Sequence, residues 1–306
     1  DWEGKLGTVG QFFYDLNCIR NARKQNFDIL LQLGYTSSSV WKNLLPKKAV
    51  IVTNMDGLEW KRSKFSKPVQ QFLKKAEKWA IESSDHLIAD SKGIQQYLNQ
   101  SHATESTYIA YGSHLFSDSN ESYLEGYGVE KSNYNMLIAR MEPENNVEVI
   151  LDGVVQSKNS SPFLVVGNTN NRFGQYLIDK FKDNENIQFI GGVYDLSALN
   201  NLRFFSKLYF HGHSVGGTNP SLLEAMASSA FIVSHKNEFN SAVLEASAIY
   251  FSTSDDISRI INQPIMPEKR KSFIQLNRNK IEELYTWKKI IQSYEDLFLK
   301  LAASKH

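Results

Sequence analysis

The clearest indication of the fold is the segment Lys207-Leu-Tyr-Phe-His-Gly-His-Ser-Val-Gly-Gly-Thr-Asn-Pro-Ser-Leu-Leu-Glu-Ala-Met-Ala227. Its first four residues predict a buried β-strand, and the run from Pro220 predicts a helix with Asn219 as its N-cap. A strand that enters a helix through a glycine-containing loop is typical of proteins with parallel sheets. The stretch therefore predicts an α/β fold.

The start of the helix at Pro220 is a predicted anion-binding site. Exposed N–H groups of the first turn and the helix dipole favour a phosphate there. Gly216 and Gly217 let the backbone approach such a ligand, because glycine carries no Cβ. Glu224 lies just over one turn inside the helix, where its carboxylate can accept hydrogen bonds from the vicinal hydroxyls of a ribose. The alternative is an ordinary junction whose glycines only form a tight turn.

Short apolar runs alternate with amphipathic stretches along the rest of the chain. The apolar runs predict strands at 27–33, 49–53, 86–89, 107–110, 134–140, 163–166, 187–190, 207–210, 231–234 and 248–251. The clearest helical pattern lies at 68–83, and two more lie at about 267–284 and 287–303. This alternation predicts parallel sheets covered by helices, which bind ligands at the carboxyl ends of their strands.

The chain of 306 residues is long enough for two Rossmann-like domains. The polar stretch 112–132 shows little periodicity and predicts the connection between them. We expect an N-terminal domain at 1–115, a C-terminal domain at 116–284, and a final helix within 285–306 that packs back towards the first domain.

Composition excludes several classes of protein. The net charge of +1 offers no strong field for nucleic acid, and Cys18, the only cysteine, excludes an internal disulfide and a cysteine-based zinc site. No apolar run approaches the ~18 residues that span a bilayer, and no signal peptide is visible. The sequence predicts a cytoplasmic protein, at most peripheral at the inner face of the plasma membrane.

Three stretches carry a resemblance to one family of enzymes. They are Gly216-Gly-Thr-Asn-Pro-Ser-Leu-Leu-Glu224, Thr53-Asn-Met-Asp-Gly-Leu-Glu-Trp-Lys-Arg62 and Ala139-Arg-Met-Glu-Pro-Glu-Asn-Asn-Val147. The first resembles the donor-site motif of family-4 retaining glycosyltransferases. Together they are similar to the bacterial β-1,4-rhamnosyltransferases that build capsule and cell-wall polysaccharides.

The resemblance covers most of the chain and implies the two-domain GT-B fold, with an acceptor-side domain followed by a nucleotide-sugar-binding domain. It implies retaining transfer of L-rhamnose from dTDP-rhamnose to a polyprenyl-linked or saccharide acceptor, with no cofactor. Alternatives on the same fold are a transferase that uses a UDP- or GDP-sugar, or a catalytically silent nucleotide-binding fragment. An oxidoreductase is disfavoured because no Gly-x-Gly-x-x-Gly follows a strand.

The expected donor site is built from cations and backbone amides, because the departing diphosphate gains negative charge as the glycosidic bond breaks. Glu224 is expected to bind the ribose, and the diphosphate contacts are expected from Arg140, Arg172, Gly216, Gly217, Thr218 and Asn219. Two positions depart from the family pattern. Gly216 stands eight positions before Glu224, where a first glutamate is usual, and Asn145 stands in a lysine slot. Arg172 is the predicted replacement for that missing charge, and a solvated loop arginine is the alternative.

Asp56 and Arg140 are the predicted catalytic residues. Asp56 is expected to orient or deprotonate the acceptor hydroxyl, although Asp-Gly is also a common turn dipeptide. Glu59, Trp60 and His213 are expected to contact the acceptor or the sugar, and the alternative for the indole is a place in the core. No Asp-x-Asp occurs in the chain, so we expect no metal site.

The region 61–78 is strongly basic, with Glu77 as its one acidic residue. Its seven cations are Lys61, Arg62, Lys64, Lys67, Lys74, Lys75 and Lys78. This patch predicts peripheral contact with the anionic membrane face or with the diphosphate of a polyprenyl carrier. A solvated helix face is the alternative.

Residues 1–20 contain no strand followed by the glycine-rich loop with which the resembled enzymes begin. The interpretation is that the N-terminal domain lacks its first strand or strands. We therefore expect a sheet edge open to self-association, nucleotide binding through the second domain, and poor sugar transfer by this chain.

Overall fold

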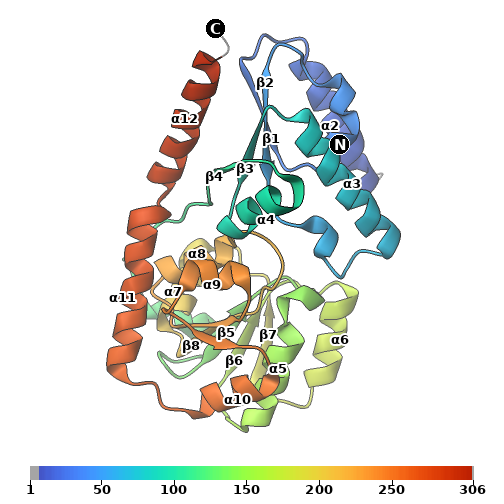
Figure 1. Ribbon diagram of the computed structural model, residues 1–306. Coiled ribbons are helices and arrows are strands. Elements are labelled where there is room, and N and C mark those ends of the chain that lie inside the picture. Colours follow the sequence, from blue (N-terminus) through green and yellow to red (C-terminus); the bar gives the residue numbers. More distant parts are fainter. Residues whose placement is uncertain (1–6, 305–306) are drawn as a thin grey trace. The chain divides into compact units, whose positions relative to one another are not determined.

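The computed structural model describes residues 7–304 and divides the chain into two compact units (Figure 1). The first unit comprises residues up to Ala110 together with those from Ile290 onwards, and the second comprises Tyr111–Lys289. Each unit has a fully parallel sheet. The predicted α/β class is confirmed. Of the first 20 residues, 1–6 lie outside the described part of the chain.

The sheet of the first unit has the order β1-β2-β3-β4. Its strands are β1 (Ile29–Leu33), β2 (Val50–Met55), β3 (His86–Ala89) and β4 (Thr107–Tyr108). Its helices are α2 (Thr8–Ala22), α3 (Lys67–Ser83), α4 (Lys92–His102) and most of α12 (Trp287–Ala303), with short 3-10 helices η1 (Ser38–Leu44) and η2 (Glu59–Lys61).

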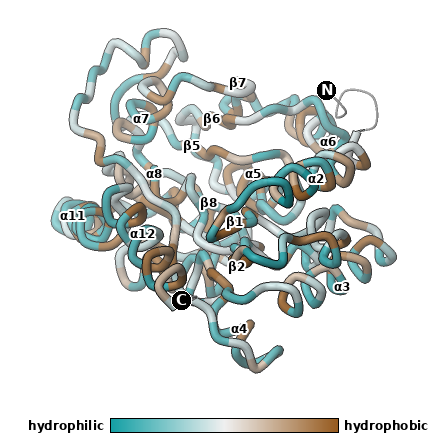
Figure 2. The backbone as a smooth tube through the Cα atoms, turned by 90° about the horizontal axis from the view of Figure 1, so that it is seen from above, coloured by the Kyte–Doolittle hydropathy of each residue, from teal (hydrophilic) through white to brown (hydrophobic). Residues whose placement is uncertain are grey.

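Helix α3 is amphipathic, as its sequence predicts. Leu73, Ala76 and Ala80 are buried, and Figure 2 shows hydrophobic and hydrophilic segments alternating around the helix. Phe72 of this helix contacts Phe12 of α2, with ring centroids 6.0 Å apart. Helix α12 lies on the opposite side of the sheet from α2 and α3 (Figure 1). Both faces of the sheet are therefore covered.

The sheet of the second unit has six strands in the order β10-β9-β8-β5-β6-β7. They are β5 (Asn135–Ile138), β6 (Phe163–Val166), β7 (Ile187–Gly191), β8 (Leu208–His211), β9 (Ile232–His235) and β10 (Ile249–Phe251). Three strands run outward on each side of the junction between β5 and β8. This is the doubly wound arrangement of nucleotide-binding sheets.

Helices cover this sheet on both faces. They are α5 (Val147–Ser157), α6 (Arg172–Phe181), α7 (Leu196–Phe205), α8 (Pro220–Ala227), α9 (Glu238–Leu244), α10 (Ser254–Asn262) and α11 (Pro267–Leu284), with 3-10 helices η3 (Glu121–Tyr127) and η4 (Pro143–Asn145). Leu137, Val165 and Phe210 lie at the centre of the core with at most 1% exposure. Continuous apolar strands therefore mark a sheet buried on both sides.

Several predicted ends differ from the observed ones. The strand expected at 134–140 ends at Ile138, because the chain turns where Glu142 N donates to the Arg140 carbonyl. The strand expected at 207–210 extends to His211, which pairs with Ser234 of β9. The polar stretch 112–132 contains η3, and Asn120 N donates to Asn201 Oδ1 of α7 at 2.7 Å.

Candidate functional site

The carboxyl ends of β5 and β8 meet at the point where the strand order of the second unit reverses. The loops that follow these strands are joined by hydrogen bonds. Asn146 Nδ2 donates to the Gly212 carbonyl at 2.7 Å, and Ser214 donates to the Glu144 carbonyl from both its backbone N–H and its hydroxyl. Doubly wound sheets bind their ligands at this switch point.

Gly212 allows this close approach. A Cβ at Gly212 would lie 2.1 Å from the carbonyl oxygen of Asn145, so a side chain there would force the two loops apart. Gly167, after β6, is similar, since its Cβ would lie 2.0 Å from the carbonyl oxygen of Ala139. Both glycines therefore let neighbouring strand-end loops pack directly against each other.

The start of α8 presents backbone N–H groups beside this junction. Asn219 is the N-cap, as predicted, and its Oδ1 accepts from Ser221 N at 2.9 Å. Gly216 has a φ of 129°, which a residue with a side chain rarely adopts. Within residues 7–304, the amides of Gly216 and Gly217 donate to no protein group. Thr218 is buried at 3% exposure. The loop thus offers amides at the positive end of a helix dipole.

Glu224 lies one turn into α8, with its side chain 37% exposed. Its Oε2 forms an ion pair with Nη2 of Arg203 on α7 at 2.5 Å. Arg203 is 1% exposed and was not predicted as a site residue. The available signal was a charged residue inside the apolar helix pattern before β8.

Arg140 and Arg172 lie after neighbouring strands β5 and β6 and are both exposed. Asn171, the N-cap of α6, joins their loops, because its Nδ2 donates to the Met141 carbonyl at 2.7 Å. Asn145 in the lysine slot is 5% exposed and donates to the Arg140 carbonyl at 2.8 Å. Asn145 therefore fixes the backbone of Arg140, and the cations of this edge are the two arginines.

His213 lies in the loop after β8 and is half-buried. Its ring stacks on that of His211 at 4.5 Å, and its carbonyl accepts from the side-chain amides of Asn237 and Asn240. Burial lowers the pKa of His211 well below its usual range, and the charges of His213, Arg203 and His235 lower it further. His211 is therefore neutral at pH 7.

The first unit gathers a second group of polar side chains at the carboxyl ends of its strands. Asp56 follows β2, and Asp90, at 3% exposure, follows β3. Burial raises the pKa of Asp56 to about 6, with a further increase from Glu59 and an opposing effect of Arg62. Burial also raises the pKa of Asp90 to about 7, with a further increase from Asp56. Both carboxyl groups therefore have pKa values closer to neutral pH than an ordinary aspartate.

Glu59 and Trp60 lie in η2, directly after Asp56. Glu59 Oε1 pairs with Arg62 at 2.8 Å, and Trp60 Nε1 donates to Glu77 Oε2 at 3.0 Å. Lys74 Nζ lies 4.9 Å from the centre of the indole. These contacts position the turn that carries Asp56.

Glu77 is a buried acceptor for four donors, which the sequence did not reveal. Besides Trp60, they are the hydroxyls of Tyr35 and Tyr97 and the His102 ring, at 3.4, 2.7 and 3.2 Å. Because Glu77 is only 1% exposed, it is not part of the solvent-facing surface of the basic region. Six of the seven cations in 61–78 are exposed, and Arg62 is half-buried.

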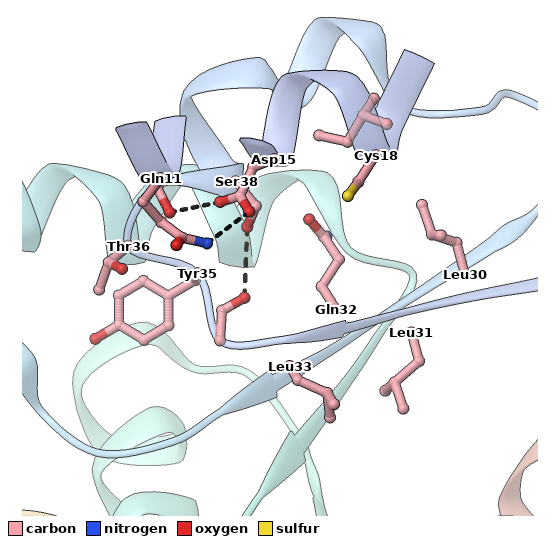
Figure 3. A pocket seen from close by; sticks show the side chains of 13 residues that line it. Gln11, Asp15, Cys18, Leu30, Leu31, Gln32, Leu33, Tyr35, Thr36 and Ser38 are labelled. Carbon is pink, nitrogen blue, oxygen red and sulfur yellow. Dashed lines mark hydrogen bonds between the residues drawn. The ribbon is translucent and has the colours of Figure 1, made fainter. Parts of the chain in front are cut away.

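A pocket of 320 Å³ lies between α2 and β1 (Figure 3). Asp15 dominates its polar rim, where it accepts from Gln11 Nε2 at 3.0 Å and from Ser37 Oγ at 2.5 Å. None of the predicted site residues lines it. The pocket borders β1, whose outer edge pairs with no other strand of the described residues.

Within residues 7–304, no three His, Cys, Asp or Glu side chains are arranged to hold a metal ion. Among the described helices, none is long and apolar enough to cross a membrane.

A doubly wound sheet with an amide-rich loop at its switch point defines the second unit as a nucleotide-binding type of α/β protein. The family is shown by sequence. The profile described as Glycosyl transferases group 1 matches residues 122–280, just over half of the chain, and the chain belongs to this family. A domain of unknown function (DUF1972) matches residues 13–114.

Solved structures show the same fold. HepE of Anabaena, in complex with UDP-glucose, has a TM-score of 0.80 at 16% identity, over 94% of this chain and 82% of that one. Sucrose-phosphate synthase of Thermosynechococcus elongatus has a TM-score of 0.78 at 14% identity, over 95% of this chain and 78% of that one. Trehalose 6-phosphate synthase of Burkholderia multivorans has a TM-score of 0.70 at 12% identity, over 97% of this chain and 76% of that one. No curated protein sequence matches the chain. The protein is a GT-B glycosyltransferase.

Proposed function

We propose that the second unit binds a nucleotide sugar at the carboxyl ends of β5 and β8. The observation that carries this proposal is the pair of free amides, Gly216 and Gly217, before the N-terminus of α8 at the switch point. A diphosphate is the ligand for which amides, a helix dipole and nearby arginines are complementary. Thr218 and Asn219 complete this loop, and Glu224 receives the ribose.

Arg140 and Arg172 stabilise the diphosphate as it leaves. Both are exposed at the carboxyl ends of adjacent strands, and neither forms an ion pair within the described residues. Negative charge grows on the leaving group in the transition state, where one well-placed donor contributes about 3–4 kcal/mol by analogy with oxyanion holes. Because no Asp-x-Asp is present, we propose that these cations take the place of a metal ion.

The acceptor is proposed to bind to the first unit. Asp56 accepts the proton of its hydroxyl, while Glu59 and Trp60 contact the acceptor. In the second unit, His213 is proposed to contact the sugar. A carboxylate with a pKa of about 6 is ionised at pH 7 and is still basic enough to take up a proton. The resemblance favours L-rhamnose from dTDP-rhamnose, transferred with retention of configuration.

The exposed lysines of 61–78 are proposed to contact anionic lipid headgroups or a polyprenyl diphosphate. Each cation near such a surface contributes about 1 kcal/mol. This fits a lipid-linked saccharide acceptor in capsule or cell-wall polysaccharide synthesis, at the inner face of the plasma membrane. Self-association through the edge of β1 remains a prediction, because an unpaired parallel edge offers free N–H and C=O groups.

A UDP-sugar donor is the second candidate. It is favoured by HepE, which shares the fold and was solved with UDP-glucose. The two donors differ in the base and at the 2′ position of the pentose, so ligand binding separates them.

Thermal shifts with dTDP, UDP, GDP and NAD test the proposal. A nucleoside diphosphate at 100 times its dissociation constant should stabilise the protein by about 2.7 kcal/mol. Glu224→Ala should lose most of this shift, whereas Glu282→Ala, at an exposed site on α11, should keep it. A response to NAD alone, or a full response from Glu224→Ala, would contradict the proposed donor site.

A further inference from the structure

One oxygen of the Glu224 carboxylate is already engaged within the protein. Oε2 lies 2.5 Å from Arg203 Nη2, whereas Oε1 has no hydrogen-bond partner in the part of the chain that the structure describes. The two oxygens of this carboxylate are therefore not equivalent for a ligand.

Arg203 is fixed in this position by a buried polar network. Its Nη1 donates to Asn200 Oδ1 at 3.1 Å, and the same oxygen accepts from Ser228 Oγ at 3.0 Å. Ser221 Oγ lies 3.5 Å from Nη2 and 3.1 Å from the Tyr209 hydroxyl. Because the guanidinium is only 1% exposed, losing its carboxylate would leave a buried charge unpaired, which is strongly unfavourable. The Arg203–Glu224 ion pair should therefore persist when a ligand binds.

We propose that Arg203 is a specificity-determining residue that leaves Glu224 one oxygen for the pentose of the nucleotide. This inference rests on the proposed function, since it takes Glu224 as the pentose-binding group. A carboxylate with two free oxygens binds both hydroxyls of a ribose in a bidentate geometry, one hydroxyl on each oxygen, whereas the Arg203 ion pair leaves Glu224 only Oε1 to face the pentose. The 3′-hydroxyl, which ribose and 2′-deoxyribose share, donates to Oε1, and the 2′-hydroxyl adds little affinity. The site therefore accepts both kinds of pentose.

Calorimetric titration with nucleotide pairs that differ only at the 2′ position tests this inference. The pairs are UDP with 2′-deoxy-UDP, and ribothymidine diphosphate with dTDP. For the wild-type protein we expect dissociation constants within about threefold inside each pair. Arg203→Met replaces the guanidinium with an apolar chain and frees Oε2. This variant should prefer the ribonucleotide by about tenfold, the usual effect of one added hydrogen bond to a charged group.

Arg270→Met is the matched control, because Arg270 also donates to buried groups, the carbonyls of Ser206 and Lys207, but does not contact Glu224. For Arg270→Met, the ratio of the two dissociation constants within each nucleotide pair should equal that of the wild type. A wild-type preference above tenfold for ribonucleotides, or an unchanged ratio in Arg203→Met, would overturn the inference while leaving the donor site intact. The wild-type comparison is decisive even if Arg203→Met does not fold. Tight binding by Glu224→Ala would instead refute the proposed function, and this inference with it.

Discussion

Asp90 lies beside Asp56 at the carboxyl edge of the first sheet, because Ala89 of β3 and Met55 of β2 are register partners. Adjacent parallel strands lie about 5 Å apart, and the charge of Asp56 adds to burial in raising the pKa of Asp90. Asn54 and Tyr294 of α12 lie nearby, with the Asn54 amide 3.4 Å from the phenol oxygen. This pair leads to two predictions.

Asp90→Asn should stabilise the protein at pH 8 but not at pH 4. The pKa of Asp90 is raised to about 7 in the folded state, so its contribution to stability is lost as pH rises through 7. A shift from 3.8 to about 7 corresponds to at most about 4 kcal/mol, and we expect 1–4 kcal/mol at pH 8. Thermal unfolding at both pH values measures this. Asp179→Asn, at an exposed site on α6, is the control, and equal effects of Asp90→Asn at both pH values would contradict the prediction.

Asp56→Asn should reduce sugar transfer by about 100-fold or more, as expected for loss of a general base. The wild-type rate should rise between pH 5 and 7, because burial raises the pKa of Asp56 to about 6 and only the ionised form accepts a proton. Glu59→Gln should move this rise to lower pH, since Glu59 raises that pKa. Rate–pH profiles measured with the donor that binds test both statements, and a profile that Glu59→Gln leaves unmoved would argue against Asp56 as the base.

Gly212→Ala should destabilise the second unit by about 1–3 kcal/mol, because the new Cβ would meet the Asn145 carbonyl at 2.1 Å. The loops after β5 and β8 would separate, so nucleotide binding should weaken as well. Gly126→Ala is the control, since its Cβ would meet no atom within 4 Å. Denaturant unfolding compares the two variants, and equal stability would show that the loops adapt.

Glu77→Gln should lower the free energy of unfolding by about 1–3 kcal/mol. In the wild-type protein the donors share a buried carboxylate, whereas in the variant an amide nitrogen would face some of them. Trp60 would lose its fixed position, and the change is measurable by its fluorescence. Glu82→Gln, on the same helix and exposed, should have a small effect, since it loses only surface ion pairs with Lys42 and Lys78. Unchanged stability of Glu77→Gln would mean that the amide can reorient to serve the same donors.

Replacing Lys64, Lys67 and Lys75 with glutamine should weaken binding to vesicles that contain anionic phospholipid, by about 10- to 100-fold at low salt. Each lysine is exposed, and a surface cation contributes about 1 kcal/mol. Vesicle co-sedimentation measures the effect, with neutral vesicles and Lys269→Gln, on α11, as controls. Equal binding to neutral and anionic vesicles would exclude an electrostatic patch.

The sequence alone predicted most of the fold, because its signals are local. Apolar runs placed the strands within a few residues, and Asn219 and Pro220 marked the start of α8. The proposed nucleotide-binding role of the loop after β8 rests on Gly216, Gly217 and Glu224, which lie within nine residues of one another. Local periodicity and helix capping depend on neighbours in the chain and can be recognised without a structure.

Only the tertiary structure could reveal partners that are distant in the sequence. Arg203 pairs with Glu224 from another helix, Asp90 and Asp56 follow adjacent strands, and Glu77 accepts from four donors in three separate segments. No local pattern encodes these contacts, because they depend on strand order and on which helix face is buried. The sequence thus indicated which groups are candidates for binding a sugar nucleotide. The fold decided which of their atoms are free to do so, since burial forces each hidden charge to find a partner.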